Sequence, residues 1–217
     1  MESWARVLDC CVDAQGRVDF DALAARPADL EQYVAHVAAF DAALLPEPQA
    51  RLAHQINAYN AMAMYAVIRA GIPQTNAGLR KIRFFFLRRY RIAGVKQSLH
   101  RYEKGIREAG DPRVHFALNC MSVSCPRLPR TPFTAAGLDA ELEREARSFF
   151  GEPRNLALDH AARKVRVSSI LEFYTSEFLA RADSLVAYIN RYVPEPIPVD
   201  YAVEFIPYDW TINRASR

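Results

Sequence analysis

The chain has 217 residues, of which 51% are hydrophobic, 24% charged and 11% aromatic, and its formal net charge is +3. This size and composition suit one folded domain with a helical extension and exclude a disordered or low-complexity chain. The small net charge gives no general case for a nucleic-acid-binding protein.

The N-terminus lacks the basic and apolar segments of a secretory signal, and the longest apolar run, residues 61–68, is too short to cross a membrane. We therefore expect a cytoplasmic protein with no membrane span. Four cysteines in a chain of this size do not resemble a disulfide scaffold, so reduced thiols are expected.

Residues 1–47 are predicted to be a helical lead-in that packs on the main body, with helices over residues 4–12, 19–25 and 27–45. Pro48 then begins a longer helix that ends near Gly71 and is apolar nearly all round, which is typical of a central buried helix. Residues 48–217 are expected to form the α+β domain itself.

His54, Asn57 and Asn60 interrupt this apolar helix at intervals of three, which places them on one narrow stripe. The stripe is either a hydrogen-bonding network in the core or the wall of a pocket, because a buried Asn must satisfy both of its amide atoms. In the second case Asn57 and Asn60 would line a substrate site.

Residues 80–95 mix β-branched and aromatic residues with a glycine, which predicts a strand or hairpin. Six basic and four aromatic residues alternate between Arg80 and Arg91, a pattern that could stack on single-stranded nucleic acid. No RNA-binding signature accompanies it, so we favour a solvated strand face with a buried aromatic side and expect no nucleic-acid partner.

Ser98 is predicted to cap a helix that runs to about Glu108 and ends at Gly110. Further predicted elements are a buried strand over residues 114–119, a helix over 134–150, strands over 155–158 and 164–167, and short helices over 169–173 and 184–191. The Pro- and aromatic-rich tail is expected to pack across the body. The fold class is therefore α+β: a single compact domain with a helical N-terminal portion, a central buried helix and a small β-sheet.

Any chemistry is expected to centre on residues 114–126, which contain His115, Cys120 and Cys125. A cysteine nucleophile needs a nearby imidazole and a third group to orient that imidazole. Glu103 is the candidate for the third group, because it lies beside the apolar face of its helix; the alternative is a carboxylate paired with an Arg at the edge of that face.

In a straight strand His115 and Cys120 would face opposite sides, about 16 Å apart. A Cys–His contact therefore requires a bend at Asn119–Cys120 or a loop that returns Cys125. Ser122 and Ser124 in this loop could help to bind an anion or oxyanion, or the loop could be an ordinary connector.

Two other sites use the same cysteines. A zinc site made of His115, Cys120 and Cys125 is conceivable, but no second Cys/His pair follows and the strand geometry opposes convergence. A Cys120–Cys125 disulfide is sterically possible, although a reducing compartment would oppose it. A redox or metal site thus remains an alternative, Cys10 and Cys11 are interpreted as structural, and no cofactor or metal is assigned.

The chain resembles the DUF547 family, a domain of unknown function. The resemblance rests on ordered motifs spread over about residues 50–190: Ile56-Asn57-Ala58-Tyr59-Asn60-Ala61, Ser98-Leu99 with Glu103, residues 111–120, Ser122, Ser124-Cys125-Pro126, residues 132–135 with Leu138 and Leu142, and Val167-Ser168 with Tyr174 and Glu177-Phe178.

Two positions depart from the family pattern. His54-Gln55 stands where relatives carry an aromatic pair, and Lys104 stands where they usually carry His after the helix glutamate. If that His is catalytic in relatives, this chain would lack their activity.

The leading hypothesis is a cysteine-dependent hydrolase or transferase acting on an amide, thioester or thiol-containing small molecule or peptide. Cys120 or Cys125 would be the nucleophile, His115 the base and Glu103 the orienting group. The alternative is a non-catalytic binding or interaction domain in which the polar side chains form a buried network. The sequence predicts neither the substrate nor the oligomeric state.

Overall fold

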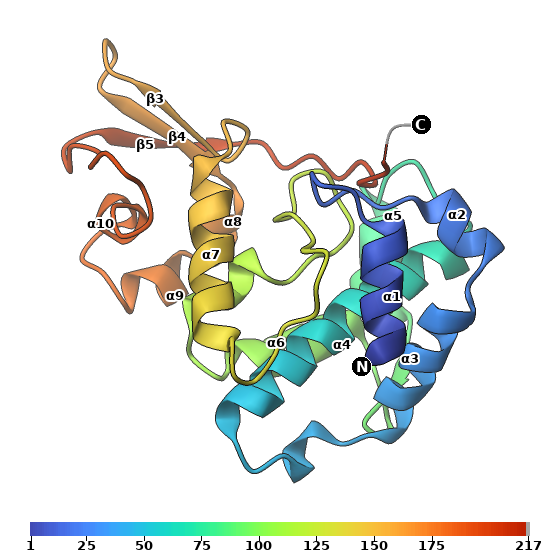
Figure 1. The fold of residues 1–217 in the computed structure, drawn as a ribbon. Helices are drawn as coiled ribbons and strands as arrows, with labels where there is room; N and C mark the ends of the chain where they lie inside the picture. The colour runs from blue at the N-terminus through green and yellow to red at the C-terminus, as the bar shows by residue number, and fades with distance from the viewer. Residues whose placement is uncertain (216–217) are drawn as a thin grey trace.

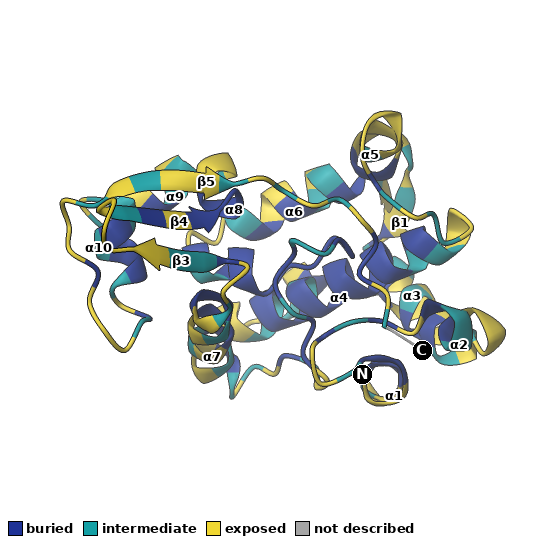
Figure 2. Ribbon diagram, turned by 90° about the horizontal axis from the view of Figure 1, so that it is seen from above, coloured by how far each residue is buried: buried dark blue, intermediate teal, exposed yellow. Residues whose placement is uncertain are grey.

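The fold is built around α4 (Pro48–Arg69), as the computed structural model of residues 1–215 shows. Most of this helix is buried, and it runs through the middle of the molecule (Figure 2). Pro48 occupies its first turn, where a missing N–H costs nothing. The predicted central helix is therefore confirmed.

Three helices and a 3₁₀ turn form the N-terminal portion: α1 (Glu2–Cys11), α2 (Phe20–Ala25), α3 (Ala28–Ala39) and η1 (Ala42–Leu44). They join α4 in one hydrophobic core, in which the rings of Trp4 and Tyr33 stack 5.6 Å apart. The helix predicted over residues 27–45 is shorter, because Phe40 is extended and Asp41 caps a separate turn by accepting from the Ala43 N–H at 2.9 Å.

Residues 79–97 correct the prediction of a strand or hairpin from residue 80. The segment starts with α5 (Leu79–Ile82) and a π-helical turn, η2 (Arg83–Leu87), in which Phe84 and Phe85 are buried. Only β1 (Tyr90–Ile92) and β2 (Val95–Gln97) form the expected antiparallel hairpin. Its two turn residues, Ala93 and Gly94, both have positive φ, as a tight right-twisted hairpin requires.

The capped helix is confirmed as α6 (Leu99–Arg107), whose Ser98 Oγ accepts from the Arg101 N–H at 3.2 Å. The strand predicted over residues 114–119 is wrong. Its first half is a 3₁₀ helix, η3 (Pro112–Phe116), started by Pro112 and by the Asp111 carboxylate, which accepts from the Arg113 N–H at 3.0 Å.

The C-terminal half contains α7 (Leu138–Gly151), α8 (Ile170–Phe173), α9 (Thr175–Leu179), α10 (Leu185–Ile189) and a three-stranded sheet. In the sheet, β3 (Leu156–Asp159) pairs antiparallel with β4 (Lys164–Ser168), which pairs parallel with β5 (Ala202–Ile206). Strands β3 and β4 were predicted from the sequence, whereas β5 was not. This half has its own core, in which Phe116, Phe149 and Phe178 cluster.

The chain after β5 crosses from the sheet to the N-terminal helices (Figure 1). Along this path Thr211 pairs with Thr75, Ile212 with Ser122 and Arg214 with Val18 in isolated β-bridges. The expected packing of the tail across the body is confirmed, as is the α+β class. No helix among residues 1–215 is long and apolar enough to cross a membrane.

Candidate active site

The loop that carries both cysteines is closed by Asn119. Its side-chain amide donates to the Pro126 carbonyl at 2.7 Å and its Oδ1 accepts from the Met121 N–H at 2.6 Å. Its own N–H donates to Asn60 Oδ1 on α4 at 2.8 Å. Met121 takes the left-handed conformation, with φ of 65°, which sharpens the bend. The loop therefore returns on itself directly after Cys120.

This return brings the two sulfur atoms together. Cys120 Sγ and Cys125 Sγ lie 2.8 Å apart as free thiols, and the Cys120 N–H donates to Cys125 Sγ at 3.1 Å. The hydroxyl of Tyr208, from the crossing tail, is 3.4 Å from the first sulfur and 3.2 Å from the second. Ser122 Oγ is 3.6 Å from Cys120 Sγ. The two thiols thus share the Tyr208 hydroxyl.

The surroundings separate the pKa values of the two thiols. Hydrogen bonding from the Cys125 thiol, and then from Tyr208 and Ser122, lowers the pKa of Cys120 against the opposing effect of burial. Burial, followed by the neighbouring Cys120, raises the pKa of Cys125 well above its usual value. Burial also raises the pKa of Tyr208, so its phenol stays protonated and can donate to a thiolate. The opposite directions of these shifts make Cys120 the more acidic of the two thiols.

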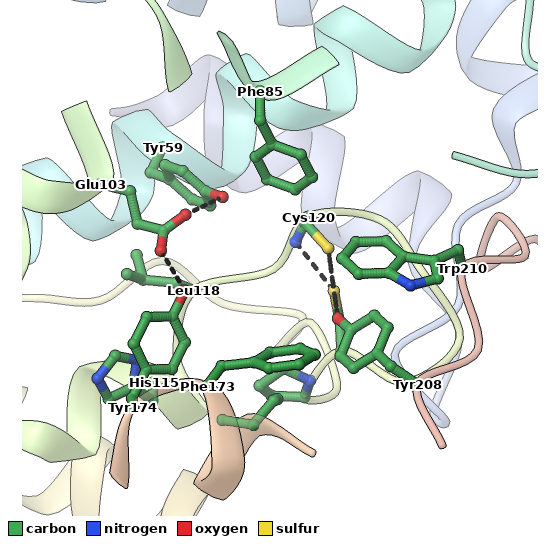
Figure 3. Close-up of a pocket in the computed structure, with 13 residues that line it drawn as sticks. Tyr59, Phe85, Glu103, His115, Leu118, Cys120, Phe173, Tyr174, Tyr208 and Trp210 are labelled. Atoms are coloured by element: carbon green, nitrogen blue, oxygen red, sulfur yellow. Dashed lines mark hydrogen bonds between the residues drawn. The ribbon is translucent and has the colours of Figure 1, made fainter. Parts of the chain in front are cut away.

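Both cysteines line a cavity of about 70 Å³. Figure 3 shows Cys120 among the aromatic residues of its wall. Its walls are mainly aromatic and aliphatic, with Phe85, Phe173 and Trp210 among them. This volume is well below the roughly 300 Å³ at which typical ligand pockets begin, so the cavity admits only a small group. Whatever reacts with Cys120 must present a small group to it.

Glu103 occupies another wall of this cavity, held by tyrosines (Figure 3). Its carboxylate accepts from the Tyr59 hydroxyl at 2.8 Å and from the Tyr174 hydroxyl at 2.7 Å, and Arg107 Nε lies 3.7 Å away. The side chain is buried, so these partners replace the water that a carboxylate needs. Burial raises the pKa of both tyrosines, so both remain donors.

We had expected Glu103 to orient His115. Instead, His115 pairs with Glu177. Its Nε2 lies 2.9 Å from Glu177 Oε2, and its ring stacks on Tyr174 with centroids 3.9 Å apart. Burial opposes ionisation of Glu177, but hydrogen bonds from His115 and Arg107 hold its pKa below the usual value. The 3₁₀ helix at residues 112–116, in place of a strand, gives His115 this direction. Arg107 links the two carboxylates, since it pairs with both Glu103 and Glu177.

Residues 45–150 match the family model described as a protein of unknown function, DUF547. The chain carries a DUF547 domain. The matched range holds α4, α6, η3 and the loop with both cysteines, whereas Tyr174, Glu177 and Tyr208 lie outside it. No curated protein and no solved structure matches the chain significantly.

The polar residues expected to line the site hold the DUF547 scaffold instead. Asn57 accepts from the Trp4 indole at 3.2 Å and from the Phe133 N–H at 3.0 Å, and donates to the Phe133 carbonyl at 2.8 Å. Asn60 donates to the Ala117 carbonyl at 2.9 Å, besides accepting from Asn119. Neither side chain lines the cavity.

The two loop serines have different surroundings. Ser122 is buried beside Cys120, whereas Ser124 Oγ accepts from the Asp209 N–H at 2.8 Å and so ties the loop to the tail. His115, Cys120, Cys125 and Glu103 all line the one cavity, as a shared site requires.

Sequence reasoning missed Tyr208 and Trp210, which complete the thiol cavity from the tail, more than eighty residues after Cys125. No spacing rule joins them to the cysteine loop, and only the aromatic content of the tail marked it. Tyr174 and Glu177 stood among the family motifs but had no assigned role.

The metal alternative lacks a ligand set. Within residues 1–215 no group of three or more His, Cys, Asp or Glu side chains is close enough to hold a metal ion. The thiol pair has hydroxyl groups as its nearest polar neighbours, and hydroxyls of Tyr and Ser are not the thiolate, imidazole and carboxylate ligands that zinc prefers.

Proposed function

We propose that the DUF547 domain is a thiol enzyme in which Cys120 is the nucleophile and Cys125 its partner. The observation that carries the proposal is the 2.8 Å approach of the two sulfur atoms on the wall of one cavity, with the Tyr208 hydroxyl bridging them. A thiolate is the reactive form of cysteine, and hydroxyl and thiol donors favour it on Cys120. The exposed fraction supports the same choice, at 8% for Cys120 and 2% for Cys125.

The reaction that suits two adjacent thiols is a two-electron oxidation by a small hydroperoxide. The Cys120 thiolate attacks the terminal oxygen, so that an S–O bond forms as the O–O bond breaks, and the alkoxide leaves as an alcohol after taking a proton. Cys125 then attacks the sulfenic sulfur of Cys120. Its thiol proton leaves with the hydroxide as water, and a disulfide remains, which an external dithiol reduces.

The size of the cavity supports this substrate class. A peroxide oxygen and its neighbours suit a cavity of about 70 Å³. A second thiol in contact with the first also serves no purpose in a simple acyl transfer, but it is the resolving group that a sulfenic acid needs.

The test is one equivalent of hydrogen peroxide added to the reduced chain, followed by intact mass measurement. We expect the loss of two hydrogen atoms and a peptide map with Cys120 joined to Cys125. The Cys125→Ser variant should instead accumulate a sulfenic acid on Cys120 that dimedone traps. Cys10→Ser is the matched control and should behave like the wild type, because Cys10 lies exposed on α1. Equal oxidation of Cys10 and Cys120 would refute the proposal.

A cysteine-dependent hydrolase or transferase is the second candidate, favoured by the polar wall across the cavity. There Glu103, with Tyr59 and Tyr174, presents hydroxyl and carboxylate groups to a bound amide or thioester. In this case Cys125→Ser, treated with a small thioester, should carry an acyl group on Cys120, and His115→Ala should slow the release of that group. Absence of the adduct would leave the redox reaction alone.

A non-catalytic binding domain is the third possibility, because Glu103 is fully hydrogen-bonded within the protein. It predicts that Cys120 reacts with iodoacetamide at neutral pH no faster than an ordinary thiol. A rate for Cys120 above that of exposed Cys10, and lost in Cys120→Ser, would rule it out.

A further inference from the structure

A second cavity, of about 440 Å³, lies where the end of α4, the loop over residues 70–76 and the α5–η2 segment meet. The two cavities are neighbours, because Phe84 lines this one and Phe85 lines the thiol cavity, with their rings 4.9 Å apart. The thiol chemistry proposed above makes no use of it.

The polar lining of this cavity is basic. Arg80, Arg83 and Arg88 contribute three guanidinium groups, and no acidic residue lines the cavity. None of the three forms an ion pair with a carboxylate within residues 1–215. Arg88 donates to the Ala66 carbonyl at the end of α4 at 3.3 Å. The site therefore concentrates positive charge without neutralising it.

Asn76 adds an independent observation. Asn76 is one of the residues that line the cavity; it is 2% exposed, and its Nδ2 has no hydrogen-bond partner within residues 1–215. Its backbone N–H is satisfied by the Trp210 carbonyl at 2.9 Å, so only the side-chain donor is left open. A buried donor without a partner costs about 1–3 kcal/mol, which a ligand with acceptor oxygens would recover.

We propose that this cavity binds the phosphate group of a small phosphorylated ligand. Three guanidinium groups and an amide offer more donors than the two oxygens of a carboxylate can accept, whereas a phosphate accepts on three oxygens and carries up to two charges. The volume lies within the usual range for ligand sites, so it leaves room for an organic part beside the phosphate.

The experiment is calorimetric titration of the full chain with pyrophosphate. The wild type should bind, and the Arg80→Ala/Arg83→Ala variant should bind at least tenfold more weakly. The matched control is Arg89→Ala/Arg91→Ala, which removes the same charge from exposed residues that do not line the cavity, and should bind as the wild type does. Asn76→Asp keeps the shape but replaces the open donor with a carboxylate, and should also lose at least tenfold in affinity.

A second experiment, with lipid vesicles, distinguishes two possible sources of the phosphate group. Leu79 is 84% and Leu87 66% exposed at the ends of the same segment, so a lipid headgroup is one source and a free metabolite the other. Sedimentation with phosphatidic acid vesicles that the Arg80→Ala/Arg83→Ala variant abolishes, without binding of soluble pyrophosphate, would assign the site to a lipid. No binding in either arm, or equal loss in the two double variants, would overturn the proposal.

Discussion

Tyr208 contributes to the ionisation of the thiol pair, because its single hydroxyl lies within hydrogen-bonding distance of both sulfur atoms. Burial raises the pKa of Tyr208, so its hydroxyl stays protonated and can donate to a thiolate. When Cys120 is a thiolate, this donor stabilises the charge; when a disulfide forms, the charge disappears and the hydroxyl loses its strongest acceptor. The same residue therefore favours the reactive state over the oxidised one.

Tyr208→Phe should therefore slow the alkylation of Cys120. A hydrogen bond to a charged group contributes about 1.5 kcal/mol or more, so we expect the rate with iodoacetamide at neutral pH to fall about tenfold. The rate at high pH, where the thiol ionises without help, should be unchanged. The measurement is the pH profile of the alkylation rate, with the site of modification confirmed by peptide mass.

The control for this variant is Tyr33→Phe. Tyr33 is also buried, but its hydroxyl has no partner within residues 1–215, so its removal changes no hydrogen bond described there. Alkylation of Cys120 should be the same in this variant as in the wild type. A slower rate in both variants would trace the effect to general destabilisation instead of to the donor.

At the scale of elements, α6 determines the position of Glu103 in the wall of the thiol cavity. The helix is short, so its ends contribute a large share of its stability. Its first turn depends on the Ser98 hydroxyl, which accepts from the Arg101 N–H in a buried position.

Ser98→Ala should lower the free energy of unfolding by about 1 kcal/mol, since one N–H at the start of α6 loses its acceptor. Ser98→Asp should retain most of the stability, because a carboxylate also caps a helix and favours its positive end. Urea unfolding followed by circular dichroism gives both values. Equal losses in the two variants would show that the hydroxyl is not acting as a cap.

Residues with strong local preferences predicted the starts of α4 and α6. Ser98 and Pro48 mark helix starts through their own hydrogen-bonding and backbone limits, and both predictions hold. The strand predicted around His115 is wrong, because Asp111-Pro112 starts a 3₁₀ helix there. A short apolar run does not distinguish a strand from a buried helical turn.

At the scale of the whole molecule, the site exists because distant segments meet. Cys120 and Cys125 come from one loop, so the sequence allowed them to lie close together. For Glu103 the sequence indicated only a position beside the apolar face of its helix. The partners that fix their chemistry are Tyr59, Tyr174 and Tyr208, from α4, the α8–α9 junction and the tail. Such contacts follow from tertiary packing, so no local pattern reports them.

The packing of the N-terminal helices on the body has its own titratable group, His54 of α4. Its ring lies 5.0 Å from that of Phe40 and 5.7 Å from that of His36, both from the α3 region. Burial, then repulsion from His36 and the N-terminal ammonium, lowers its pKa from 6.5 to about 4. His54 is therefore neutral in the folded protein at pH values where the unfolded chain would protonate it.

The sign of the resulting pH dependence follows from this difference. Above the unfolded pKa both states hold neutral His54 and stability is full; as the pH falls toward the folded pKa, only the unfolded state gains the proton. We expect the free energy of unfolding to decrease by about 2 kcal/mol from this residue between about pH 7 and about pH 4.5. His54→Phe keeps an aromatic ring against Phe40 but cannot titrate. Its free energy of unfolding should therefore decrease by about 2 kcal/mol less than that of the wild type over the same pH range. Urea unfolding at a series of pH values measures the difference, and parallel losses in the two proteins would show that His54 is not the group responsible.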